Sequence, residues 1–453
     1  MEKNKKSRRD FLKTTAIGAA GLMMPGMGMS AKSYASILGA NDRINVAIVG
    51  LGRRVGAYIG PIADPKSNVK LLYLCDVMQS QMENAKERFM HPNNKIDYSI
   101  KLEENFFKVI EDPRVDAIIN ATPDHWHAPG TWLANAAGKH VYLEKPGSHN
   151  PYEGEMLLKA RQRYGKVIQL GNQQRSSLES IHIINKIHNG AIGNPYMAKA
   201  FYTASRGRVI NPEKAAIPEG LNWDLWQGPA PRKAYEHNTW DYNWHWYGWD
   251  YGTAEAGNNA LHELDVARWA LQVKYPEQVT ANSDKYHFLD DGWTMYDTMD
   301  ATFKFPGNKV IKWDGKSRNG HKTYGAGRGT IIYGTEGSVW VDRDGYQLYD
   351  RGGNLIESSE SEDGEGGTQL GGGGNMTSRH VRNFFEAIRG KEKQRSPIEE
   401  GVTSMLLCHL ANISSRIGDE MLKCDTNNGH ITNSEKAMGL WKREYEKGWE
   451  PKF

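Results

Sequence analysis

A run rich in β-branched residues, Ile44–Val49, ends in the glycine turn Gly50-Leu51-Gly52. A strand, a glycine turn and then a helix, in this order, are typical of the phosphate-binding turn of a dinucleotide-binding Rossmann unit. Gly50 permits the tight turn, Gly52 lets the backbone approach a pyrophosphate, and the N-terminus of the next helix favours negative charge. The third glycine, Gly56, falls one position later than usual, so the turn alone is weak evidence.

A carboxylate at the end of the next apolar run supports this interpretation. The run Val69–Cys75 leads into Asp76, which follows Gly50 by 26 residues. A carboxylate there accepts hydrogen bonds from the adenosine ribose hydroxyls and repels a 2′-phosphate, so Asp76 favours NAD over NADP. Arg53 and Arg54 can still approach a phosphate, which keeps NADP open as the alternative. Asp76 can also serve as a helix N-cap, and that is compatible with both roles.

Two further apolar runs end in residues that can do chemistry. Residues 115–121 lead into Thr122-Pro123-Asp124-His125-Trp126-His127, and His140–Leu143 leads into Glu144-Lys145-Pro146. The carboxyl ends of parallel strands meet at one edge of a sheet, where ligands bind. An ammonium at that edge can stabilise an alkoxide that develops as a hydride leaves, which is the role we expect for Lys145. The alternative is a surface lysine that ends a strand.

An aromatic stretch in the second half has the composition of a sugar-binding wall. Residues 240–251 hold four of the 14 Trp residues of the chain, interleaved with His, Asn and Asp. An aromatic face suits the C–H side of a sugar ring, while adjacent polar groups take its hydroxyls. An aromatic core loop is the alternative. The candidate substrate contacts of this half are Arg175, Trp244, His245, Trp249, Asp250, Asn258 and His262.

Three polar side chains follow the aromatic stretch at helical spacing. Asn258, His262 and Asp265 stand at i, i+4 and i+7, which places them on one helix face. Asp265 either orients His262 or pairs with Arg268. A metal site formed by His262 and His245 is disfavoured, because no tighter ligand spacing supports it, and we expect no metal.

The motif Glu144-Lys145-Pro146, preceded by residues 122–127, resembles the Gfo/Idh/MocA oxidoreductase family over nearly all of the chain after residue 42. The resemblance implies that Lys145 lies beside the nicotinamide and the reacting hydroxyl, orients the substrate and helps to move its proton. It also implies that His262 is the general base. Asn258 departs from the family, which commonly has Asp there, and an amide cannot polarise an imidazole as a carboxylate does. The expected cofactor contacts are Gly50, Gly52, Arg53, Arg54, Asp76, Thr122, Pro123, His125, His127, Glu144 and Lys145.

The N-terminus has the pattern of an export signal. The paired arginines Arg8 and Arg9, followed by Phe-Leu-Lys and the uncharged residues 14–31, resemble a twin-arginine signal over residues 1–35. A disordered basic tail or a membrane helix is the alternative, but the apolar part is too short and too rich in Gly to span. The resemblance implies a periplasmic protein, exported already folded. Since free NAD is not expected there, the enzyme should hold its cofactor tightly and return it to its starting state, unless a partner reoxidises it.

Two sets of strands and helices are needed to position the candidate site residues. Strand-like runs alternate with helical segments up to residue 165, which predicts a doubly wound parallel sheet. We therefore expect an α/β protein with an NAD-binding Rossmann domain over residues 42–165. A substrate-binding α/β domain with an open, largely antiparallel sheet is expected over residues 166–453. The elements expected there are a helix over 178–189, strands over 197–204, 278–281, 298–305 and 309–313, a connecting loop over 357–375, and returning helices over 380–389 and 404–417.

Charge and cysteine content exclude some partners and a disulfide framework. Residues 1–35 carry seven basic and two acidic residues, so the remainder has a net charge of −2 against +3 for the chain. That balance gives no sign of a nucleic-acid partner, which requires a basic face. The three cysteines include no CxxC pair. We expect a small carbohydrate substrate, no stable membrane span and, from the resemblance, a homo-oligomer (dimer or tetramer).

Three functions are compatible with this sequence. The first is a dehydrogenase that oxidises a ring hydroxyl of a sugar or glycoside. The second is a redox-neutral enzyme that cleaves glycosides by oxidation, elimination, hydration and reduction. Export with trapped NAD favours this second function, whereas the intact Glu144-Lys145-Pro146 motif favours the first. The third, a non-catalytic sugar-binding protein, is disfavoured because both Lys145 and His262 are retained.

Overall fold

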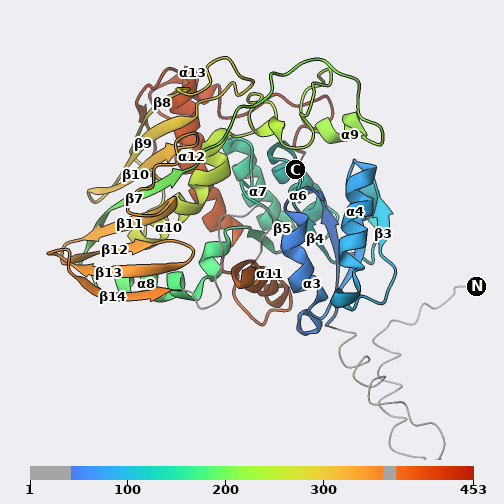
Figure 1. Ribbon diagram of the computed structural model, residues 1–453, viewed down its shortest axis with the longest axis horizontal. Coiled ribbons are helices and arrows are strands. Elements are labelled where there is room, and N and C mark those ends of the chain that lie inside the picture. Colours follow the sequence, from blue (N-terminus) through green and yellow to red (C-terminus); the bar gives the residue numbers. More distant parts are fainter. Residues whose placement is uncertain (1–41, 361–373, 453) are drawn as a thin grey trace, which may run out of the picture. The chain divides into compact units, whose positions relative to one another are not determined.

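Six parallel strands form the first sheet of the computed structural model, which describes residues 42–360 and 374–452 (Figure 1). Their order is β3-β2-β1-β4-β5-β6. From β1 the chain adds β2 and β3 on one side of the sheet, and it then adds β4, β5 and β6 on the other side. Ligands of doubly wound sheets bind in the crevice between β1 and β4, where this order reverses. The strands are β1 (Ile44–Val49), β2 (Val69–Cys75), β3 (Lys101–Glu103), β4 (Ala117–Asn120), β5 (His140–Leu143) and β6 (Ile168–Leu170).

Helices cover both faces of this sheet, because its central strands are apolar on both sides. Val46, Ala47 and Ile48 of β1 are all completely buried. One covering helix comes from the C-terminal part of the chain, since Phe384 and Phe385 join the core around Ile48. The covering elements are the 3₁₀ turn η2 (Val55–Tyr58), α3 (Ile59–Ala63), α4 (Gln79–Phe89), α5 (Phe106–Glu111), α6 (Asp124–Ala136), α7 (Pro151–Tyr164) and α11 (Gly374–Ile388).

The second sheet has nine strands in the order β14-β13-β12-β11-β7-β10-β9-β8-β15. Within this second sheet, β7 and β10 form a parallel pair, and the other described strand pairs are antiparallel. Side chains of β9 alternate between buried and more exposed, as in a sheet with one covered face. The strands are β7 (Pro195–Thr203), β8 (Gln278–Asp284), β9 (Thr298–Phe305), β10 (Lys309–Lys316), β11 (Arg328–Gly334), β12 (Gly337–Val341), β13 (Gly345–Asp350), β14 (Leu355–Glu360) and β15 (Leu422–Lys423).

Helices α10 and α12 lie between the nine-stranded sheet and the first sheet with its helices (Figure 1). Helix α10 packs on β7 and β11, while α12 contacts β8 on one side and α7 on the other. Both sheets belong to one compact unit, Ile44–Phe453. The helices of this half are α8 (Leu178–His188), α9 (Trp223–Gln227), the π-helical turn η7 (Ala256–Ala260), α10 (Leu261–Leu271), α12 (Ile398–Arg416) and α13 (Glu435–Met438).

The structure confirms the predicted fold class, a parallel Rossmann sheet joined to a largely antiparallel sheet. The expected strand over residues 298–305 agrees with β9, and the expected helix over 178–189 agrees with α8. Strands β11 to β14 were not predicted from the sequence. The expected signal at residues 1–35 and most of the expected loop at 357–375 lie outside the described residues. In the part of the chain that the structure describes, no helix is long and apolar enough to span a bilayer.

Candidate functional site

A cavity of about 680 Å³ opens at the carboxyl ends of β1, β4 and β5 and extends to the second sheet. Fourteen of the predicted site residues line it, so the structure brings together most of the residues that the sequence singled out. They are Gly50, Gly52, Arg53, Arg54, Asp76, Thr122, Pro123, His127, Glu144, Lys145, Trp244, His245, Asn258 and His262.

The glycine turn leaves an open cradle beside the end of β2. A Cβ atom on Gly50, whose φ is +86°, would lie 2.5 Å from the carbonyl group of Ala121, so only glycine fits there. A Cβ on Gly52 would meet no atom within 4 Å. The backbone at Gly52 is therefore open to a ligand, which fits the pyrophosphate of a dinucleotide.

Asp76 ties the glycine turn to β2 and faces the cavity. Its carboxylate accepts the N–H groups of Leu51 at 2.6 Å and Met78 at 2.9 Å. Burial raises the pKa of Asp76 to about 6, although these backbone bonds act to lower it. At neutral pH the carboxylate is mostly ionised and suited to accept ribose hydroxyls, so this end of the cavity fits NAD.

Glu144 connects the loop after β5 to Arg54 and Tyr58. Its Oε1 accepts hydrogen bonds from Arg54 Nε at 3.1 Å and from the Tyr58 hydroxyl at 2.8 Å, while its Oε2 accepts the Lys145 N–H at 3.2 Å. Burial alone would raise the pKa of Glu144, but Arg54, Lys145 and the Tyr58 hydroxyl together outweigh burial and lower it. Glu144 is thus a buried anion that fixes Arg54 and the start of the Lys145 loop.

His127 joins the loop after β4 to the loop after β5. Its Nδ1–H donates to the carbonyl oxygen of Pro146, and its buried Nε2 has no hydrogen-bond partner among the described residues. Burial lowers the pKa of His127 to about 4, so the imidazole is neutral. His125, also predicted to contact the cofactor, does not line this cavity and instead bonds through Nε2 to the Trp226 carbonyl oxygen at 2.9 Å.

Lys145 reaches from β5 to the second half of the chain. Its Nζ donates to the backbone oxygen of Asn258 at 2.8 Å and to Asn258 Oδ1 at 3.1 Å. Burial lowers the pKa of Lys145 to about 8, although the Asp124 and Glu144 carboxylates act to raise it. An ammonium poised near neutral pH can hold a developing oxyanion and also exchange a proton.

Glu255 orients Asn258, and the sequence did not single it out. Its Oε1 accepts the Asn258 amide at 3.0 Å, and its Oε2 accepts the Asn259 amide at 2.9 Å and the Ser317 hydroxyl at 2.6 Å. Because the amide of Asn258 donates to Glu255, its Oδ1 points to Lys145. The network Glu255–Asn258–Lys145 therefore connects a buried carboxylate to the Lys145 ammonium through one amide.

A π-helical turn changes the expected arrangement of Asn258, His262 and Asp265. The turn Ala256–Ala260 precedes α10, and such turns often occur at functional sites. Asn258 and His262 line the cavity, whereas Asp265 does not.

The expectation that Asp265 orients His262 or pairs with Arg268 was wrong. Its carboxylate accepts bonds from Arg175 Nε at 2.7 Å and Nη2 at 2.9 Å, and from the Ser404 hydroxyl at 2.6 Å. Arg268 pairs with Glu400 instead. Arg175, a predicted substrate contact, is thus held in a buried ion pair and does not line the cavity.

His262 faces the cavity from α10 and is surrounded by cations. Burial lowers the pKa of His262 well below its usual value, and Arg343, Lys145 and Arg328 lower it further. A neutral imidazole at pH 7 is able to accept a proton, which is what a general base requires.

The aromatic stretch forms part of the cavity wall and part of the core. Trp244 stacks on His245 with ring centroids 3.5 Å apart, and both line the cavity. Trp249 and Asp250, two predicted substrate contacts, do not line it. The Trp249 ring lies under the Arg416 guanidinium at 4.6 Å, and Asp250 pairs with Lys233.

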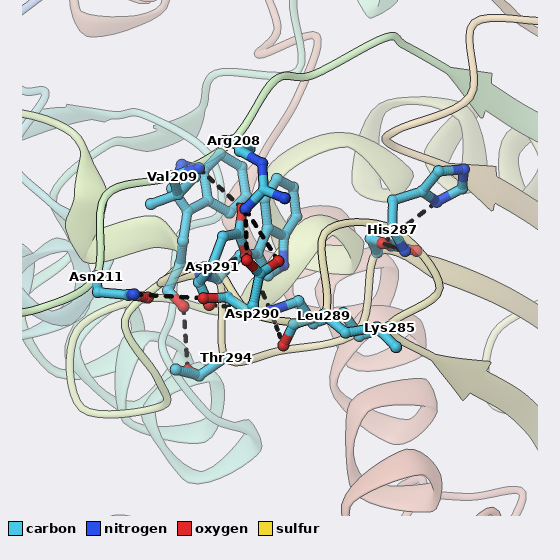
Figure 2. Close-up of polar contacts among 12 residues, drawn as sticks. Arg208, Val209, Asn211, Lys285, His287, Leu289, Asp290, Asp291 and Thr294 are labelled. Atoms are coloured by element: carbon cyan, nitrogen blue, oxygen red, sulfur yellow. Dashed lines mark hydrogen bonds and ion pairs between the residues drawn. The ribbon is translucent and has the colours of Figure 1, made fainter.

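The buried carboxylate of Asp291 joins two loops next to the aromatic stretch, and Figure 2 shows it beside Val209 and Lys285. Asp291 accepts the N–H groups of Val209 at 2.9 Å and Trp293 at 3.1 Å, and it forms ion pairs with Lys285 and Arg318. The Trp293 ring stacks on Trp246 at 3.9 Å. The loop after β7 and the loop after β8 are therefore joined through Asp291, and together they hold the aromatic stretch.

Arg53 contacts two residues of the aromatic stretch at the cavity wall. Arg53 Nη2 lies 3.1 Å from Asp241 Oδ2, and its guanidinium lies 4.2 Å from the centre of the Tyr242 ring. All three residues line the cavity. Because Arg53 follows Gly52 directly, this contact links the glycine turn to the opposite wall.

Two family models match the chain. Residues 44–172 match an oxidoreductase family with an NAD-binding Rossmann fold, and residues 198–341 match the C-terminal alpha/beta domain of the same oxidoreductase family. Together they cover more than half of the chain. Residues 44–172 are thus an NAD-binding Rossmann domain.

Named relatives act on sugars and polyols. Inositol 2-dehydrogenase of Salmonella paratyphi B is 23% identical over 51% of this chain and 56% of its own length. A glycosyl hydrolase family 109 protein of Shewanella baltica is 22% identical over 53% of this chain and 50% of its own length. The chain therefore spans about half the length of the curated relatives it matches.

A solved structure shares the fold over a larger part of the chain. Levoglucosan dehydrogenase, in complex with NADH and levoglucosan, has a TM-score of 0.62 at 18% identity, covering 84% of this chain and 99% of that chain. At this identity the likeness shows the fold alone.

Proposed function

Because the chain belongs to the Gfo/Idh/MocA oxidoreductase family, we propose that it oxidises a ring hydroxyl of a sugar or glycoside with tightly held NAD. One observation carries this proposal. Lys145 from the end of β5 and His262 from α10 line the same cavity as the open glycine turn. The named activity of the inositol dehydrogenase relative points to the same substrate class.

The residues of the cavity divide the proposed reaction between them. Gly50, Gly52 and Asp76 would hold NAD, which accepts a hydride from the hydroxyl-bearing carbon when it is bound. The neutral imidazole of His262 takes the hydroxyl proton, so that the carbon becomes a carbonyl. The Lys145 ammonium stabilises the negative charge that develops on the oxygen, and Asn258 holds that ammonium in place.

Redox-neutral cleavage of a glycoside is the second candidate. The match to a glycosyl hydrolase family 109 protein favours it, since that match covers a similar share of the chain as the dehydrogenase match. In this reaction the ketone formed first acidifies the neighbouring C–H, the aglycone leaves, water adds, and the hydride returns. The intact Glu144-Lys145-Pro146 motif still favours net oxidation.

We also propose that the protein is exported by the twin-arginine route to the periplasm and forms a homo-oligomer. The basis for export is Arg8-Arg9 and the uncharged stretch after it. Export would favour an enzyme that retains its cofactor. Export is tested by fractionating cells that produce the full chain, with and without the Arg8→Lys/Arg9→Lys substitutions. Sedimentation analysis of the purified protein tests whether it forms an oligomer.

One experiment separates the two enzymatic functions. Purified protein is incubated without added cofactor with aryl glycosides and free sugars, while reduced-nicotinamide absorbance and products are followed. A stoichiometric keto-sugar supports oxidation, and many turnovers to free sugar support cleavage. The Lys145→Met variant should form neither product, whereas Lys159→Ala, which changes an exposed lysine of α7, serves as the matched control. Absence of both products and of NAD in the denatured protein would overturn both functions.

A further inference from the structure

The cavity extends away from Lys145 to the ends of β2 and β3. In the first sheet, β5, which leads into Lys145, and β2, which leads into Asp76, lie on opposite sides of β1. A carboxylate at the end of β2 binds the adenosine ribose, so the adenine of bound NAD belongs beyond Asp76. Val77, Glu104 and Phe107, which follow β2 and β3, line the cavity there. This end of the cavity is therefore the expected adenine pocket.

A segment of the second half of the chain covers this pocket. The segment, residues 218–230, is called the strap here; it contains α9 and belongs to the long connection between β7 and η7. In Figure 1, α9 stands above α4. Leu225 and Trp226 of the strap line the cavity together with the residues that follow β2 and β3. The adenine pocket is thus formed partly by the first sheet and partly by the strap.

Backbone hydrogen bonds tie the strap to the chain just after β2. Met78 and Leu221 stand opposite each other in an antiparallel bridge, with one backbone hydrogen bond of 2.9 Å on either side. Both side chains are 8% exposed, and they share a small core with Trp223 and Trp244. The strap is therefore packed as well as hydrogen-bonded at this point. The two bonds run from Gln79 N–H to the Gly220 oxygen and from Asn222 N–H to the Val77 oxygen.

Two side chains of the first half hold the strap at other points. The indole N–H of Trp126 donates to the backbone oxygens of Leu225 at 3.1 Å and Trp226 at 2.9 Å. Glu104 Oε1 accepts a hydrogen bond from the side-chain amide of Asn222. The strap is thus attached after β2, after β3 and at α6, so opening the adenine pocket requires breaking several of these contacts.

We propose that the strap closes the adenosine end of the NAD site and retains the cofactor between turnovers, with Leu225 and Phe107 lining the adenine pocket. The inference rests on the tight retention of NAD in the proposed function and names the segment responsible for it. Release of NAD then requires the strap to lift from the first sheet, and opening steps of this kind limit exchange of a bound molecule. The identity of the sugar does not enter.

A reversible disulfide tests whether the strap must open. Met78 and Leu221 form a non-hydrogen-bonded antiparallel pair, whose Cα atoms are typically about 4.5 Å apart, within the range of a disulfide. The Met78→Cys/Leu221→Cys variant is loaded with labelled NAD and oxidised, and its bridge is checked by mass spectrometry. Release into excess unlabelled NAD should be roughly tenfold slower, or more, than from the reduced variant. Wild type under the same oxidant is the control, because its three cysteines are buried.

The outcomes of this test separate the strap from the proposed function. Equal release from the oxidised and reduced forms would overturn the strap as the barrier, since NAD would then leave by another side. Failure of the two cysteines to form a bridge would contradict the pairing of the strap with the end of β2. Rapid release from the wild type would instead refute tight retention, whatever the bridge does. All of these results are read from bound label, without turnover.

A second variant loosens the strap without cysteines. Asn222→Asp keeps an oxygen for the Leu225 N–H, which Asn222 Oδ1 accepts at 3.0 Å, but it places a carboxylate against Glu104. NAD release should become about 2- to 10-fold faster, as expected for the loss of one hydrogen bond. Adding Glu104→Gln restores a donor and should return release toward the wild-type rate, and Glu104→Gln alone is the matched control. Unchanged release in Asn222→Asp, or no rescue in the double variant, would contradict the proposed anchor.

Discussion

The contact between Arg53 and the aromatic wall should slow the release of NAD. Arg53 pairs with Asp241 at 3.1 Å and lies over Tyr242, so we expect a dinucleotide bound at Gly52 to leave past this contact. The perturbation is Asp241→Asn together with Tyr242→Leu, which removes both partners and keeps Arg53 itself.

The magnitude follows from the exposure of the contact. The side chains of the ion pair are 47% and 43% exposed, so the pair contributes roughly 0.2–1 kcal/mol. The cation–π contact adds about 0.5–1 kcal/mol at such a site. Their loss should speed NAD release by roughly 3- to 30-fold, since about 1.4 kcal/mol is a factor of ten. The effect of Asp241→Asn alone should shrink at high salt.

The assay loads the protein with labelled NAD, adds an excess of unlabelled NAD and follows the label that stays bound. Asp250→Asn is the matched control, because Asp250 forms a similarly exposed ion pair with Lys233 but does not line the cavity. An unchanged release rate in the double variant, or an equal acceleration by Asp250→Asn, would show that this contact does not retain NAD.

Four further outcomes are expected. Lys145→Met should lower hydride transfer by roughly 10²- to 10⁴-fold and leave NAD bound, as read by single-turnover absorbance and NAD content. In the wild type, activity should fall as pH rises through about 8, where Lys145 loses its proton, and Lys145→Arg should remove this limb from the pH–rate profile. Glu255→Gln should weaken the hold on Asn258 and lower kcat about tenfold with a shifted pH profile, whereas an unchanged profile would remove Glu255 from its positioning role. Asp291→Ala should cost about 3–5 kcal/mol in urea unfolding, because it leaves the buried Arg318 without its partner. Burial acts to raise the pKa of Asp291, but Arg318 and the other hydrogen-bond donors outweigh burial and lower it. The stabilisation by Asp291 is therefore complete above about pH 4, the pKa of an unfolded Asp, and it is lost as the pH falls through the lower pKa of the folded state.

Local pattern predicted four strands of the first sheet, β1, β2, β4 and β5, but not the short strands β3 and β6. The run Ile44–Val49 is rich in β-branched residues and mostly buried on both faces, and it is followed by a turn that only glycine can form, so strand and turn were predictable together. The predicted strand Thr298–Phe305 alternates in the sequence, and the structure gives the same bounds. Strands β11 to β14 were not predicted from the sequence.

The site was only partly predictable, because side-chain partners come from distant segments. Nothing near Arg175 in the sequence indicates that Asp265, 90 positions later, takes its guanidinium. The π-helical turn before α10 is likewise invisible to a count of helical spacing. A glutamate three positions before Asn258 was a usable signal for Glu255, since i,i+3 partners share a helix face.

We expect the nicotinamide and the reacting hydroxyl to meet between Lys145 and His262. A crystal structure of the protein with NAD and a bound sugar measures this directly. We expect one sugar hydroxyl within hydrogen-bond reach of both Lys145 Nζ and a ring nitrogen of His262, with its carbon facing the nicotinamide. A nicotinamide ring bound away from these two side chains, or a sugar held elsewhere in the cavity, would contradict it.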